Sequence, residues 1–238
     1  MTVQEGIPEF LTRKPKVPSG RLIGTYTILQ GYKNCPHQMM RRYIKKDQPY
    51  VETPEMAWGN KIHSAFELRI SAKKPLPAEM QAWEGFAVPF DGRNVLVEQK
   101  LGITDEAKPI DYWDKDRCWF RGKADAVIID DELAFIGDFK SGNSKYEDPF
   151  ELATNALLLK AAHPGLKKVV GSYIWLKENR VGQQYDLSDF RETWREMCRL
   201  MGEIEADRAS GKWAKIKSGL CGYCSVTDCE NHYVARKG

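Results

Sequence analysis

The sequence predicts a mixed α/β fold, in which helices flank a central sheet. One observation is that apolar segments of strand length are separated by segments with helical periodicity. Another is the length of 238 residues with 42% hydrophobic residues, which suffices for one large α/β domain or two small ones. The predicted strands cover residues 94–101, 119–129, 133–140, 168–177 and, more briefly, 183–186.

The chain before the first strand is predicted to be helical after a loose start. Residues 1–24 contain several prolines and basic residues without periodicity, so we expect an N-terminal arm there. The remaining residues, 25–238, are expected to form one domain. Helical patterns begin at Thr25. The expected helices before the sheet cover residues 25–34, 36–45, 58–70 and 78–86.

The second half of the chain alternates strands with helices. An acidic turn at residues 130–132 joins the second and third strands, which predicts an antiparallel hairpin. Asp148, Pro149 and Glu151 are typical of a helix start, with Asp148 as the N-cap and Glu151 as the returning acid of a capping box. We expect this helix to end at His163 and a last, long helix to cover residues 188–210.

Composition excludes some classes of protein. The net charge of +3, from 36 basic and 33 acidic residues, excludes a polycationic tail but permits a local basic groove for nucleic acid. No apolar run reaches transmembrane length, and the first residues lack the pattern of a signal peptide. We therefore expect a cytoplasmic protein without membrane association, and its small size without a second domain fits the cytoplasm of a prokaryote or of a phage-infected host.

The chemistry is expected at the end of the strand over residues 133–140. Asp138 and Lys140 are two residues apart and therefore point to the same face of that strand. Asp125 lies in an apolar strand, where a carboxylate costs free energy unless it is paired or bound to metal. The hairpin brings Asp125 toward Asp138. Two neighbouring carboxylates are compatible when a cation lies between them, and Mg²⁺ or Mn²⁺ suits their oxygens. His63 adds a nitrogen ligand, which favours Mn²⁺.

Each of these residues also has a simpler interpretation. An Asp-x-Lys unit is usually a surface ion pair, and an isolated helix histidine is usually structural. Asp125 is equally compatible with a solvent-facing strand end. The order of the residues weakens these interpretations: a helix histidine, a strand glutamate, a strand aspartate and then Asp-x-Lys after a hairpin.

This order resembles the RecB-like branch of the PD-(D/E)XK nucleases, over most of the chain from about residue 25. The motifs that carry the resemblance are Gly59-x-x-x-His63, Glu98, Gly122-x-x-Asp125 and Ile136-Gly137-Asp138-Phe139-Lys140-Ser141-Gly142. The resemblance implies a restriction-endonuclease-like fold with a mixed central sheet flanked by helices. It also implies that His63, Asp125 and Asp138 bind the metal, that Lys140 assists catalysis, and that Glu98 is a further catalytic acid.

The helix after Lys140 departs from the family pattern. Members of the family often carry Gln-x-x-x-Tyr there, as part of the active site and of the DNA contact. The matching positions in this sequence are Glu151 and Asn155, which the resemblance therefore implies as weak candidates for DNA binding.

Cysteines near the C-terminus indicate a second metal site. Cys221, Cys224 and Cys229 supply three thiolates, and the candidates for a fourth ligand are Cys35, His232 and His37. By spacing alone zinc is the default interpretation, and an iron–sulfur cluster equally accepts four thiolates. AddB-type and CRISPR-associated RecB-like nucleases hold a [4Fe–4S] cluster with one cysteine before the nuclease motifs and three after them. That resemblance implies a cluster on Cys35, Cys221, Cys224 and Cys229 that joins the N- and C-terminal segments, with Zn²⁺ as the alternative.

The expected function is therefore Mg²⁺- or Mn²⁺-dependent hydrolysis of DNA phosphodiesters. We expect an exonuclease that processes DNA ends in recombination, repair or phage DNA metabolism. The alternatives are a structure-specific or single-strand endonuclease and, from another class, a catalytically inactive DNA-binding or assembly module. No ATPase motif is present, so a helicase or recombination partner would be a separate chain. A homo-oligomer remains an open alternative.

Overall fold

The computed structural model describes residues 22–48 and 51–233, which form two compact units. The first unit is Glu52–Trp194, and the second combines residues 22–48 and 51 with residues 195–233. The single domain expected over residues 25–238 stays a prediction, since compactness alone separates these two units. The expected N-terminal arm lies outside the described residues, apart from residues 22–24.

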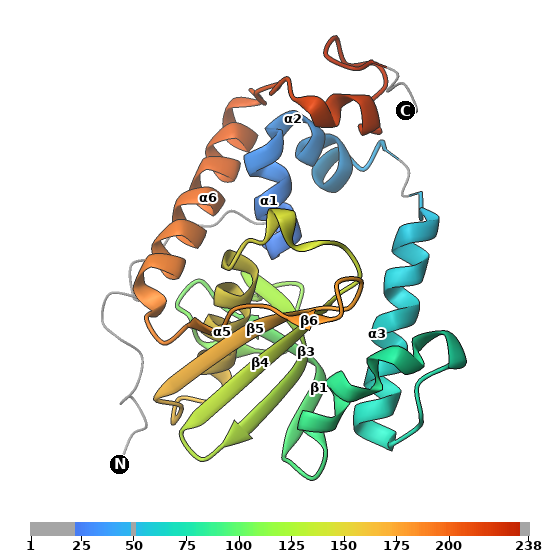
Figure 1. The fold of residues 1–238 in the computed structure, drawn as a ribbon. Helices are drawn as coiled ribbons and strands as arrows, with labels where there is room; N and C mark the ends of the chain where they lie inside the picture. Colours follow the sequence, from blue (N-terminus) through green and yellow to red (C-terminus); the bar gives the residue numbers. More distant parts are fainter. Residues whose placement is uncertain (1–21, 49–50, 234–238) are drawn as a thin grey trace, which may run out of the picture. The chain divides into compact units, whose positions relative to one another are not determined.

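The first unit is built on a seven-stranded sheet with the order β2-β1-β3-β4-β5-β6, in which β7 also pairs with β5 (Figure 1). The β3–β4 pair is the predicted antiparallel hairpin, and β4 and β5 are parallel. Parallel neighbours need a crossover connection, which the helix α5 provides. The strands are β1 Val95–Ile103, β2 Pro109–Ile110, β3 Phe120–Asp130, β4 Leu133–Lys140, β5 Lys168–Trp175, β6 Arg180–Val181 and β7 Tyr185–Asp186.

The helices largely follow the sequence patterns. In the first unit they are α3 Pro54–Ala72, α4 Glu84–Ala87, α5 Phe150–Ala162 and the start of α6 Phe190–Ser210. Short 3₁₀ helices cover Ala78–Trp83, Val88–Phe90 and Ser144–Tyr146. The second unit contains α1 Tyr26–Asn34, α2 Pro36–Met39, a π-helical turn over Met40–Lys45, the rest of α6 and a 3₁₀ helix over Gly219–Tyr223. In the described residues, no helix is long and apolar enough to cross a membrane.

The starts of α3 and α5 differ from the prediction in ways that their N-terminal contacts explain. The helix α3 begins at Pro54 rather than at residue 58, because the Thr53 hydroxyl accepts a hydrogen bond from the Met56 amide at 3.3 Å. The helix α5 begins at Phe150 with Pro149 as its N-cap, and Asp148 accepts a hydrogen bond from the Phe150 amide. The predicted capping box is wrong, because the carboxylate of the acid at position 151 is engaged with a lysine of β4.

The two main helices of the first unit cover opposite faces of its sheet. Phe139 of β4 and Ile174 of β5 belong to the apolar cluster beneath α3. Gly171, which is an odd number of residues from Ile174, points the other way, and a side chain there would lie 3.5 Å from Leu152 of α5. The parts of β3 and β4 that carry Asp125 and Asp138 therefore lie between α3 and α5.

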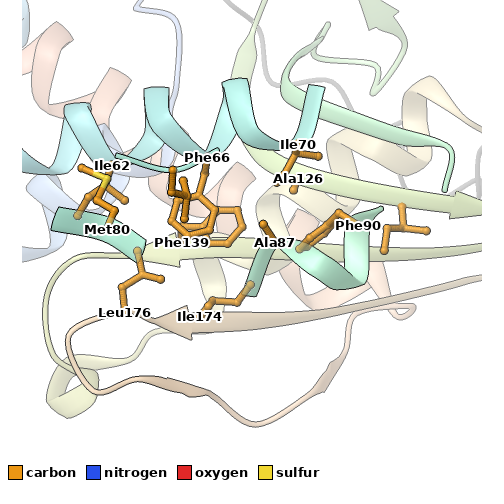
Figure 2. Close-up of a cluster of buried hydrophobic side chains, with 12 residues drawn as sticks. Ile62, Phe66, Ile70, Met80, Ala87, Phe90, Ala126, Phe139, Ile174 and Leu176 are labelled. Carbon is orange, nitrogen blue, oxygen red and sulfur yellow. The ribbon is translucent and has the colours of Figure 1, made fainter. Parts of the chain in front are cut away.

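A stacked aromatic pair holds α3 against the sheet. The rings of Phe66 and Phe139 have centroids 4.1 Å apart, both side chains are buried, and Figure 2 shows them side by side between the helix and the strand. Phe66 is one turn after His63, and Phe139 lies between Asp138 and Lys140. This hydrophobic contact therefore fixes the spacing between the helix and the strand that carry the candidate catalytic residues.

Truncation of Phe66 to Ala should destabilise the protein by about 3–5 kcal/mol, because it removes both apolar burial and the stacking partner of Phe139. Urea unfolding followed by circular dichroism measures this change in the free energy of unfolding. Val181→Ala is the control, because Val181 is 54% exposed and its truncation should change the free energy by less than about 0.5 kcal/mol. Similar losses for both variants would contradict the role given to the Phe66–Phe139 pair.

Candidate active site and cysteine centre

A polar pocket of about 420 Å³ lies where β3 and β4 separate, within the first unit. It is lined by the catalytic and metal-binding residues that the sequence predicted for the nuclease site: His63, Glu98, Asp125, Asp138 and Lys140. Glu151 of α5 also lines it. Asp125 and Asp138 are only 8% and 6% exposed, so their charges need partners or a cation.

Asp125 is oriented by the end of the β3–β4 ladder. The last paired residues are Ala126 and Gly137, and beyond them the backbone amide of Phe139 donates a hydrogen bond to Oδ2 of Asp125 at 2.9 Å. The side chain thereby occupies the gap between the two strands. The other oxygen, Oδ1, lies 3.2 Å from Nδ1 of His63.

His63, Glu98 and Asp125 form a compact set of ligand atoms. The set comprises one imidazole nitrogen and two carboxylate oxygens, all within 4.8 Å of one another. Nδ1 of His63 lies 3.9 Å from Oε1 of Glu98 and is buried, yet it has no hydrogen bond of good geometry to any described residue. Proximity to the Asp125 carboxylate, against the effect of burial, raises the pKa of His63 above its usual value. Nitrogen and oxygen atoms that converge in this way fit a divalent cation.

Glu98 reaches this set because the backbone of β1 is locally twisted. Val97 and Gln99 pair with Ala126 and Ala124 of β3, whereas Glu98 between them has a φ of +50°. This left-handed conformation is unfavourable for a residue with a side chain, and such local distortions of a strand commonly redirect a side chain at a functional site. The strain at Glu98 is therefore consistent with a functional role for its carboxylate.

Lys140 lies between two acids at the other side of the pocket. Its ammonium nitrogen is 2.9 Å from Oδ1 of Asp138 and 2.7 Å from Oε2 of Glu151. Burial alone would lower the pKa of Lys140, but the attraction of the two carboxylates outweighs it and raises the pKa. Burial raises the pKa of Asp138 to about 7, against the opposing attraction of Lys140. Lys140 is thus held in its charged form.

Two of the expected site residues lie outside the compact set of ligand atoms. The expected ligands were His63, Asp125 and Asp138; among the described residues the atoms that converge belong to His63, Glu98 and Asp125, while Asp138 lines the same pocket and faces Lys140. Asn155 does not line the pocket. It is 6% exposed and donates a hydrogen bond of 3.4 Å to a backbone carbonyl of β3, so direct DNA contact by Asn155 does not fit its burial.

Lys123 is a pocket residue that the sequence analysis did not single out. Its ammonium group pairs with Glu98, and its side chain lines the pocket. A signal was present, because Lys123 precedes Asp125 by two residues in the same strand and alternate strand residues share a face.

The second unit brings the four predicted cysteines together. Cys35, which follows α1, lines one cavity with Cys221, Cys224 and Cys229. His37 and His232 line the same cavity. Burial raises the pKa of the Cys224 thiol, and the other three thiols act in the same direction. The backbone amides of Ser218 and Val226 point at the sulfurs of Cys221 and Cys224, each at 3.4 Å.

Comparison with known proteins bears on the fold. No protein-family model matches this sequence, and no curated protein matches it. The crystal structure of SSO0001 has a similar fold. The two chains are 16% identical, the match covers 92% of this chain and 90% of SSO0001, and the TM-score is 0.52. At this identity the likeness supports the α/β fold alone.

Replacing Glu98 by Gly should separate stability from metal binding. Without metal, Glu98→Gly should be more stable than Glu98→Gln by about 1 kcal/mol, because glycine adopts a positive φ without strain. Both variants should lose most of the increase in melting temperature that saturating Mn²⁺ gives the unmodified protein, since both lack the carboxylate. Calorimetry with and without Mn²⁺ measures both effects. A Glu98→Gly protein that is less stable than Glu98→Gln would contradict the strain at this position.

Proposed function

We propose that this protein is a metal-dependent deoxyribonuclease that hydrolyses phosphodiester bonds in the pocket at the end of β3 and β4. The observation that carries the proposal is the convergence of His63, Glu98 and Asp125 beside a charged lysine. A bound cation would neutralise charge on the phosphate and activate the attacking water. Two carboxylates and one imidazole suit Mn²⁺ or Mg²⁺, and the nitrogen ligand favours Mn²⁺.

The protein side chains contribute orientation and charge. Asp125 keeps one oxygen on the Phe139 amide, so its other oxygen is fixed toward the metal ligands. Lys140, held as an ammonium ion by Asp138 and Glu151, would stabilise the negative charge that develops on the phosphate. Because Asp138 and Glu151 hold Lys140 in its charged form and raise its pKa, we assign it an electrostatic role rather than that of a general base.

Glu151 has a supporting role in this proposal. It occupies the place where the nucleases that this sequence resembles often have glutamine, and its carboxylate holds Lys140 from the α5 side. We therefore assign Glu151 to the positioning of Lys140 rather than to direct contact with DNA.

The decisive test is cleavage of linear and covalently closed circular DNA with Mn²⁺ or Mg²⁺. The unmodified protein should degrade linear DNA and leave closed circles intact if it acts at ends. Asp125→Asn and Lys140→Ala should each lower the rate by at least about 100-fold, because they remove a metal ligand and transition-state charge. Lys167→Ala is the matched control, since Lys167 is exposed and its ion pair is with Glu132, near the β3–β4 turn.

The outcomes separate the possible activities. Nicking or cleavage of closed circles would indicate an endonuclease with the same site. Binding of DNA without cleavage of any substrate would indicate an inactive binding module and would refute the proposed enzyme. Retained activity in Asp125→Asn would place the metal elsewhere.

We further propose that the second unit holds a [4Fe–4S] cluster on Cys35, Cys221, Cys224 and Cys229. Support comes from the cavity that the four cysteines share and from the backbone amides that point at the sulfurs of Cys221 and Cys224. Such a centre would join the helices α1 and α2 to the C-terminal segment and contribute to the stability of that unit.

Protein purified without oxygen should be brown, with absorbance near about 400 nm and four iron atoms per chain by elemental analysis. Cys221→Ser should lose the colour and unfold at a lower temperature, because a ligand of the centre is removed. Cys118→Ser is the control, since Cys118 is buried in the sheet unit and lies outside the cavity. A colourless protein with one zinc per chain would refute the iron–sulfur cluster and support zinc as the bound metal.

A further inference from the structure

The segment between β2 and β3 presents an exposed aromatic side chain among cations. Trp113 is 60% exposed, and its ring packs edge-on against Tyr112 with centroids 4.9 Å apart. The ammonium nitrogen of Lys100 lies 5.1 Å from the centre of the Trp113 ring. The guanidinium carbon of Arg121 lies 4.7 Å from the centre of Tyr112 and 5.9 Å from that of Trp113. We call Lys100, Tyr112, Trp113 and Arg121 the aromatic platform.

Local contacts hold the aromatic platform in place. The carboxylate of Asp111 accepts a hydrogen bond from the Trp113 amide at 2.7 Å, and Arg121 donates one to the Tyr112 carbonyl at 3.1 Å. Gly102 of β1 allows the segment to lie close to the sheet, because a side chain there would meet the Ile110 carbonyl at 3.1 Å. The exposed ring is therefore presented by a fixed segment, at little cost in conformational entropy on binding.

The cations of the platform are available to a polyanion. Neither Lys100 nor Arg121 forms an ion pair with any described acid, whereas Asp114 in the same segment is paired with Arg117 at 2.7 Å. Two unpaired cations beside an exposed indole ring are the elements with which proteins hold unpaired nucleotides.

The platform lies on the same strands as the proposed catalytic pocket. Lys100 is directly opposite Lys123, which lines the pocket, so the two side chains share one face of the β1–β3 ladder. Arg121 precedes Asp125 by four residues of β3, a distance of roughly 13 Å along the strand. One DNA strand can therefore contact the pocket and the platform at the same time.

We propose that the aromatic platform binds an unpaired nucleotide of the DNA strand that is cleaved, with the base stacked on Trp113 and its neighbouring phosphates on Lys100 and Arg121. This inference rests on the proposed nuclease function and specifies its substrate as DNA with a single-stranded segment. Every base has an aromatic face, so the contact would select for unpaired strands rather than for sequence.

Binding of a fluorescein-labelled oligothymidylate of about 12 nucleotides, a length within the site size of single-strand binders, tests the proposal by anisotropy in EDTA. EDTA withholds the catalytic cation, so the oligonucleotide stays intact. Trp113→Ala should bind about tenfold more weakly, and Trp113→Phe should restore most of the affinity because phenylalanine also stacks. Leu133→Ala is the matched control, since Leu133 is an exposed apolar residue at the opposite end of β4.

An abasic oligonucleotide of the same length isolates the stacking from the charge. The unmodified protein should bind it about tenfold more weakly than oligothymidylate, and Trp113→Ala should bind both alike. Lys100→Met should reduce the dependence of log Kd on log salt concentration by about one phosphate contact.

Equal affinity of Trp113→Ala and Leu133→Ala for oligothymidylate would overturn the proposal, as would undiminished binding of the abasic strand. The absence of single-strand binding by the unmodified protein would overturn it too. Failure of the nuclease function is distinct: it would appear as stacking on Trp113 without cleavage of any DNA in Mn²⁺.

Discussion

The hydrogen bond from the Phe139 amide to Asp125 is the interaction on which the candidate active site depends. It forms at the first position where β3 and β4 no longer pair, so a side chain replaces the missing partner of a backbone amide. One carboxylate oxygen is committed to the fold, and the other is left beside His63. The backbone amide of Phe139 thereby orients the buried Asp125 carboxylate, which in turn supplies the hydrogen-bond acceptor that this amide needs.

The hydrophobic core below the pocket supplies the second constraint. On α3, Phe66 lies one turn after His63, and on β4, Phe139 alternates with Asp138 and Lys140. Stacking of the two rings therefore sets how far the helix stands from the strand, and with it the separation of the imidazole from the carboxylates. A loss of packing at Phe66 would therefore disturb the geometry of the candidate active site even though no polar residue changes.

The second unit, which contains the four cysteines, is stabilised in a different way. Its segments come from distant parts of the sequence, and the His37 amide donates a hydrogen bond to the Ala214 carbonyl at 3.0 Å. Arg41 reinforces this contact by pairing with both Asp47 and Asp228. Exposed ion pairs contribute little to stability, so a centre on the four cysteines would be the strongest link between these segments.

The sequence by itself determined the α/β fold and the β3–β4 hairpin, because periodicity and strand alternation assign each side chain to a face of its own element. The expectation that His63, Asp125, Asp138 and Lys140 form one site came from the resemblance of their order to the motifs of RecB-like nucleases. Contacts between elements were decided only in the tertiary structure. Glu98 joins the ligand set because its own backbone is left-handed, a conformation that no sequence pattern indicates. The carboxylate of Glu151 pairs with Lys140 instead of capping its helix. The burial of Asn155 likewise depends on how closely α5 approaches β3, a distance that side-chain packing sets.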